Sequence, residues 1–195
     1  MIADIQSTVA PRHLTAEELA QGLAEVCLAP KDVGTLQLIV ARPQSEQRLA
    51  LESAELSPEH GLLGDRWRAT SWLRLPDDSP DPAVQITLMN ARCIQLVAGD
   101  REFWPLAGDN LFVDFDLSQE NLPVGSRLTI GGAVLEIAEP PHNGCAKFKR
   151  RFGLPALAFV NSQQGKALRL RGVHARVVQA GPIAVGDPIR VVRNS

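Results

Sequence analysis

Short runs of alternating hydrophobic and polar residues dominate the chain from Gly34 onward. Such runs predict β-strands, because every second side chain of a strand points to the same face. Gly, Pro, Asp and Asn separate the runs, as is typical of turns. The predicted strands cover residues 35–41, 49–56, 84–89, 110–115, 127–130, 133–138 and 173–179. Many short strands with a few helices predict a mainly β, α+β domain built as a barrel.

The segment 127–137 gives the clearest local prediction. Residues alternate on both sides of Gly131 and Gly132, and a Gly-Gly pair suits the two-residue turn of a β-hairpin. We therefore expect two paired strands here.

Three segments follow a helical period instead. Thr15 and Glu18 have the spacing of a capping box, and hydrophobic residues then recur at helical intervals, which predicts a helix over 15–28. Shorter helices are predicted over 90–98, with Asn90 as its N-cap, and over 155–162. We divide the chain into an N-terminal helical extension, residues 1–33, and a β-barrel domain, residues 34–195.

The composition limits the classes of partner. The chain has 195 residues and a formal net charge of −2, so no global basic field favours nucleic acid, and any anion site must be local. No apolar stretch approaches the length of a membrane span, and we expect a cytoplasmic protein without a membrane or nucleic-acid partner.

The three cysteines are Cys27, Cys93 and Cys145. Their wide spacing and odd number disfavour a disulfide framework and a zinc site. Cys27 and Cys93 lie among apolar residues in helical patterns, so we expect both to be buried in the core.

Cys145 differs because its surroundings are polar and basic. It follows Pro-Pro and Asn-Gly, which predict a turn, and its neighbours include one histidine and four cations: His142, Lys147, Lys149, Arg150 and Arg151. Nearby positive charge favours a thiolate, which is both a nucleophile and a soft-metal ligand. The alternative is an inert, buried thiol.

Several further segments occur in a fixed order with Cys145. They are residues 61–66 (GLLGDR), 107–111 (AGDNL), the hairpin, 145–148 (CAKF), 171–177 (RGVHARV), 181–183 (GPI) and 185–187 (VGD). Together they resemble the MOSC family, the domain named after the C-terminal part of molybdenum cofactor sulfurases, from about residue 34 to the C-terminus. The resemblance implies a pyruvate-kinase-type β-barrel, in agreement with the predicted strands.

The resemblance also implies a site for the molybdenum cofactor. Cys145 corresponds to the cysteine that the family retains and is expected to bind molybdenum and to take part in catalysis, with His142 as a proton donor; His174 is a second candidate for that role. The cofactor's phosphate needs cationic donors, and its pterin needs polar partners. The expected cofactor-binding residues are Asp65, Arg66, Asp109, Asn110, Lys147 and Arg171, with Arg68 and Lys149 as further phosphate donors. No pyridoxal phosphate domain is expected, because the chain is too short to hold one beside the barrel.

Two positions depart from the family pattern. Trp67 stands where the family often has His, and Asp109 stands where it has Glu. Three functions stay open. The protein reduces small N-hydroxylated compounds with electrons from a donor protein, or carries sulfur from a sulfur-donor protein as a Cys145 persulfide for metal-sulfur cofactor assembly, or binds the cofactor without turnover. The first makes the protein a molybdenum-dependent oxidoreductase, and the second makes it sulfurtransferase-like.

Overall fold

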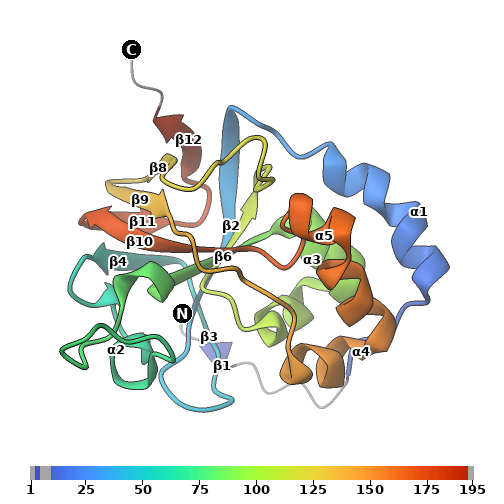
Figure 1. The fold of residues 1–195 in the computed structure, drawn as a ribbon, viewed down its shortest axis with the longest axis horizontal. Coiled ribbons are helices and arrows are strands. Elements are labelled where there is room, and N and C mark those ends of the chain that lie inside the picture. Colours follow the sequence, from blue (N-terminus) through green and yellow to red (C-terminus); the bar gives the residue numbers. More distant parts are fainter. Residues whose placement is uncertain (1–2, 5–9, 193–195) are drawn as a thin grey trace.

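A closed barrel of seven strands forms the centre of the protein in the computed structural model, which describes residues 3–4 and 10–192 (Figure 1). Around the barrel the order is β2 (Val33–Ala41), β12 (Pro188–Val192), β8 (Arg127–Ile130), β9 (Ala133–Ile137), β10 (Val173–Gln179), β6 (Ile86–Asn90) and β7 (Leu111–Asp114). β7 pairs with β2 and closes the barrel. The β6–β7 pair is parallel, and the barrel's other pairs are antiparallel.

The remaining strands lie outside the barrel. β3 (Leu49–Leu51) pairs with β2, and β1 (Ala3–Asp4) pairs with β3. A second sheet has the order β11 (Gly181–Ala184), β4 (Ser53–Ser57) and β5 (Gly61–Leu62). The single strand predicted over 49–56 is therefore wrong, because the chain leaves one sheet at Glu52 and enters the other.

Most of the helices gather on one side of the barrel (Figure 1). These are α1 (Ala16–Cys27), α3 (Ala91–Ala98), α4 (Ala146–Asn161) and α5 (Gln163–Ala167). The short α2 (Trp67–Thr70) lies apart from them, and two 3₁₀ turns, η1 (Pro82–Val84) and η2 (Arg101–Ala107), complete the set. α3 and η2 form the crossover that a parallel β6–β7 pair requires. Among the described residues, no helix is both long and apolar enough to cross a bilayer.

Two hydrophobic cores result, and β2 contributes to both. Leu36 and Ile39 pack inside the barrel, whereas Leu38 and Val40 face the helices. α1 adds Leu19 and Val26 to the second core and packs against α3 and α4.

Local sequence signals gave correct predictions. β8 and β9 form the predicted hairpin, with Gly131 at φ +53°, and a Cβ on Gly131 would lie 2.4 Å from Asp187 Oδ2. Thr15 caps α1 through the predicted capping box, and the Asn90 side chain accepts the N–H of Cys93 to cap α3.

Two other predictions were wrong in part. Cys93 is buried as expected, but Cys27 is exposed. Cys27 follows the buried Val26, and its side chain therefore lies away from the buried face of α1. The helix predicted over 155–162 is the second half of α4, which begins at Ala146 and kinks at Gly153, with φ +89°.

Candidate functional site

A hollow of about 470 Å³ lies between the β2–β3 connection, helix α2 and the start of helix α4. We call it the arginine pocket. Its charged lining comprises five cations and one carboxylate: Arg42, Arg48, Arg66, Lys147, Arg151 and Asp65. Cys145, His142, His174, Trp67 and Trp72 also line it. The composition allows an anion site only locally, and this cationic pocket in a protein of net charge −2 is a candidate for it.

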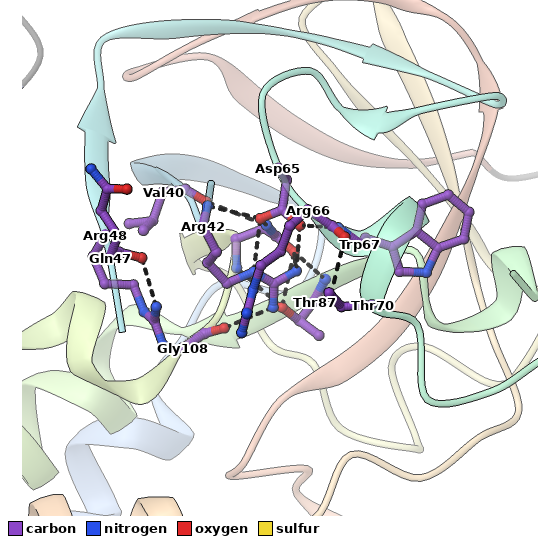
Figure 2. Close-up of polar contacts among 11 residues, drawn as sticks. Val40, Arg42, Gln47, Arg48, Asp65, Arg66, Trp67, Thr70, Thr87 and Gly108 are labelled. Atoms are coloured by element: carbon purple, nitrogen blue, oxygen red, sulfur yellow. Dashed lines mark hydrogen bonds and ion pairs between the residues drawn. The ribbon is translucent and has the colours of Figure 1, made fainter. Parts of the chain in front are cut away.

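Arg42 is held rigidly on one side of this pocket (Figure 2). Its Nε and Nη2 atoms donate to Asp65 Oδ2 and Oδ1 over 2.8 and 3.0 Å, a bidentate ion pair. Nη1 donates to the Gly108 carbonyl, and Nη2 also donates to Asn110 Oδ1. Asp65 in turn accepts the backbone N–H groups of Arg42 and Trp67, so the ion pair is part of the fold.

Asn110 lies beneath this ion pair. It has no exposed surface, and its Oδ1 atom also accepts the N–H and hydroxyl of Thr87. Its Nδ2 atom donates to Val40 O and Asp65 Oδ2. Asn110 therefore holds Arg42 and Asp65 in place and has no free polar atom for a ligand.

Arg48 lies on the same connection but has few partners. It is only 7% exposed, Nη1 donates to the Gln47 carbonyl over 2.7 Å, and Nε has no hydrogen bond (Figure 2). Among the described residues none forms an ion pair with it. Burial lowers the pKa of Arg48 to about 10, and the charges of Arg151, Arg42 and Arg66 act in the same direction, whereas the carboxylate of Glu46, which makes no ion pair with Arg48, acts against them. A buried cation without a counter-ion is costly, and a bound anion would remove that cost.

Two further cations of the pocket come from helix α4. Lys147 and Arg151 both contact the carboxylate of Glu46, which is half-exposed on the β2–β3 connection. Arg151 also donates to the Leu106 carbonyl over 2.7 Å. Arg66, at the start of α2, forms no side-chain hydrogen bond or ion pair with the described residues and extends toward Arg42 and Arg48 (Figure 2).

Cys145 is the N-cap residue of α4, and its thiol is exposed on the pocket lining. The backbone before it is fixed from the far end of the same helix. Gly144 N–H donates to Asn161 Oδ1 over 2.8 Å, and Asn161 Nδ2 donates to the Gly144 carbonyl over 3.1 Å. A Cβ on Gly144 would lie 2.8 Å from Leu157 Cδ1 and 3.0 Å from Val160 Cγ2, so a larger residue would force these side chains to shift.

Asp109 and Arg171 form a buried ion pair behind the pocket wall. Arg171 Nη1 donates to Asp109 Oδ2 over 2.6 Å, and Nη2 donates to the Ala107 carbonyl. The other oxygen, Oδ1, lies 3.4 Å from Nδ1 of His142. The ring centroids of His142 and His174 are 4.5 Å apart.

Burial sets the charge of these histidines. It lowers the pKa of His142 well below its ordinary value and lowers that of His174 to about 4, and the charge of Arg171 adds to both effects. Both imidazoles are therefore neutral at pH 7.

A second hollow of about 520 Å³ lies on the other side of this histidine pair. Glu139, Lys166 and Arg169 line it, and it shares Pro141, His142, Asn143 and His174 with the arginine pocket. The two imidazoles thus form part of a wall between two hollows.

The structure brings six of the predicted site residues to the arginine pocket: Cys145, His142, His174, Asp65, Arg66 and Lys147. Asp109, Asn110 and Arg171 lie behind its surface. Arg68, which pairs with Glu59, and Lys149 are not on the lining. The sequence analysis missed Arg42, Arg48 and Asn161. The only signal for the two arginines was their position just after a predicted strand and just before the next.

Part of the chain matches a known family model, and several solved structures are similar in fold. The family model of the MOSC domain matches residues 99–190. The structure of YuaD from Bacillus subtilis is similar at a TM-score of 0.60 and 19% identity, covering 84% of this chain and 97% of that one. YiiM from Escherichia coli has a TM-score of 0.52 and 18% identity, covering 83% and 71%. YiiM from Geobacillus stearothermophilus has a TM-score of 0.55 and 16% identity, covering 83% and 75%. A search of curated proteins finds no significant match.

Proposed function

We propose, from the premise that this chain contains a MOSC domain, that the arginine pocket binds the molybdenum cofactor and that Cys145 is the protein ligand of the metal. The observation that supports this most directly is Arg48, a buried cation that forms no ion pair with the described residues, in a pocket lined by five cations and one carboxylate. The volume of about 470 Å³ lies within the roughly 300–1,000 Å³ of small-molecule sites.

The residues of the pocket fit the chemistry of this cofactor. Arg48, Arg66 and Arg151 would donate to the phosphate, for which the planar guanidinium suits bidentate binding. Arg42 is already held by Asp65 and shapes the pocket. The exposed Cys145 would offer a soft thiolate to molybdenum.

When bound, the cofactor would supply two-electron redox chemistry. We propose that the protein uses it to reduce small N-hydroxylated compounds, with electrons from a donor protein in the cytoplasm. Trp67 lines the pocket where the family often has His, and its indole N–H can donate a hydrogen bond but does not titrate, so the titratable rings of the pocket are His142 and His174.

Metal content tests the proposal. The protein is purified from cells that make the cofactor, and molybdenum and phosphate are quantified for the wild type, Cys145→Ser and Arg48→Met. We expect about one molybdenum per wild-type chain and at least a tenfold loss in both variants. Arg68→Met is the matched control, because Arg68 is an exposed arginine outside the pocket, and it should retain the metal. A metal-free wild type would contradict the proposal.

The exposed thiol of Cys145 also suits a second candidate function, transfer of sulfur through a persulfide. This function needs an accessible thiol but no metal. Cyanide-labile sulfur that is lost in Cys145→Ser, with no molybdenum, would favour it. Molybdenum retained without turnover of a hydroxylamine or amidoxime, in the presence of an added reductase, would favour a cofactor-binding module.

A further inference from the structure

One carboxylate in the wall of the arginine pocket has an oxygen without a hydrogen bond. Asp109 is fully buried, and Arg171 occupies its Oδ2 atom. Oδ1 accepts no hydrogen bond from the described residues, and the nearest ionisable partner is Nδ1 of His142, at 3.4 Å. That nitrogen is also buried without another partner.

Backbone geometry brings these two groups together. Gly108 ends η2 in the left-handed region, at φ +89° and ψ +12°, and the chain turns inward at Asp109. Gly172, at φ +103°, lies against the His142 ring, because a Cβ there would be 3.3 Å from Nδ1 and 2.1 Å from the Leu88 carbonyl oxygen. The position of the ring therefore depends on a glycine at 172.

The charges of the two groups decide where the proton lies. Burial raises the pKa of Asp109 on balance, although the charges of Arg171, Arg42 and Arg48 oppose the shift. The 2.6 Å ion pair with the permanently charged Arg171 is the geometry of an ionised carboxylate. The His142 imidazole is neutral, because burial and the charge of Arg171 lower its pKa. A neutral imidazole has one N–H, and the neighbouring carboxylate favours that N–H at Nδ1.

We propose that Asp109 is a positioning residue that fixes His142 with its proton on Nδ1, so that the unprotonated Nε2 is offered to a ligand as a hydrogen-bond acceptor. The contact with Asp109 uses Nδ1, which leaves Nε2 as the other ring nitrogen, and His142 lines the pocket. The inference deepens the proposed function. It changes His142 from the expected proton donor into an acceptor for an N–H or O–H group, such as the hydroxyl of an N-hydroxylated compound.

The acceptor complements the rest of the lining. The arginines and Lys147 only donate hydrogen bonds, and they would bind the anionic part of a ligand. His142 would instead recognise a neutral N–H or O–H group of the same or a neighbouring ligand. His174 has no carboxylate beside its Nδ1 atom among the described residues, so its tautomer is not fixed in this way.

Nitrogen NMR of the histidine rings tests the proposal on metal-free protein. The chain has four histidines, His13, His60, His142 and His174, and each can be assigned by single substitution to Gln. Spectra are recorded about two units above the ordinary imidazole pKa of about 6.5, where the rings are neutral. His13 is an internal reference, because its Nε2 lies 3.1 Å from the Arg151 carbonyl and must donate. We expect His142 to show the opposite pattern, with Nε2 at the unprotonated position.

Asp109→Asn supplies the matched variant. Arg171 will retain the amide oxygen, so the amide NH₂ will face His142 Nδ1 and donate to it, and the proton should move to Nε2. Asp65→Asn is the control: it alters another buried carboxylate at this pocket, bound to Arg42, and should leave the His142 tautomer unchanged.

A protonated Nε2 in wild-type His142 would overturn the proposal, as would an unchanged tautomer in folded Asp109→Asn. If Asp109→Asn does not fold, the wild-type spectrum still decides. Because the spectra need no molybdenum, this test can fail while metal binding stands, and the reverse also holds.

Discussion

Arg42 and Arg48 line the same pocket from the same connection, yet their surroundings are opposite. Arg42 has a bidentate carboxylate, a side-chain amide and a carbonyl as partners. Arg48 has one backbone carbonyl, three arginines whose charges lower its pKa, and the carboxylate of Glu46, which opposes them without forming an ion pair. An arginine with all its partners belongs to the fold, whereas a buried one without an ion-pair partner is a candidate for ligand binding.

Removing Arg42 should give the largest effect on stability. Arg42→Met leaves the Asp65 carboxylate, whose side chain is 1% exposed, without its counter-ion. We expect a loss of about 3–5 kcal/mol in the free energy of unfolding, measured by urea denaturation. Arg127→Met is the control, because it removes an exposed ion pair and should cost at most about 1 kcal/mol. Equal losses in the two variants would show that the buried Arg42–Asp65 ion pair contributes no more to stability than an exposed one.

Acid should have the second-largest effect on stability, through His174 in the wall of the pocket. The pKa of His174 is about 4 in the folded protein and about 6.5 when unfolded, so below pH 6.5 the unfolded chain binds the extra proton. The contribution of His174 to the free energy of unfolding is fully present above pH 6.5 and is lost as the pH falls toward 4, which costs about 3 kcal/mol. In His174→Asn the free energy of unfolding, measured by urea denaturation at several pH values, should fall less steeply between pH 6.5 and pH 4 than in the wild type. An unchanged slope would show that His174 does not cause the loss.

Arg48→Met should have the smallest effect on stability and the opposite sign. Replacing a buried, unpaired cation by an apolar side chain should raise the free energy of unfolding by about 0.5–2 kcal/mol. Inorganic phosphate should stabilise the wild type in thermal unfolding and lose that effect in the variant. A destabilised variant would mean that Arg48, like Arg42, belongs to the fold.

The parts of the fold that depend on neighbouring residues could be predicted from the sequence. The hairpin at Gly131 and Gly132 and the capping box at Thr15 involve residues a few positions apart, and the structure confirms both. The break at Glu52 could not be predicted, because the apolar pattern continues while the strand's partners change from one sheet to the other.

Cys145 and its basic neighbours could be selected from the sequence because they lie within residues 142–151. Asp65 and Arg66 are distant in sequence and were selected through the resemblance to the MOSC family. Arg42 and Arg48 meet Gly108 and Arg151 only after the barrel closes, and no spacing in the sequence indicates this. Likewise, the chain itself did not indicate that Asp109 would face His142 rather than a ligand.

The hydrogen bonds between Asn161 and Gly144 make the length of helix α4 part of the site. A helix turns by about 100° per residue, so one residue inserted or deleted between Ala146 and Val160 would swing Asn161 away from the Gly144 backbone. Relatives built on this plan should therefore tolerate substitutions along α4 far better than changes in its residue count. The number of residues in α4 thus sets the position of the Cys145 thiol.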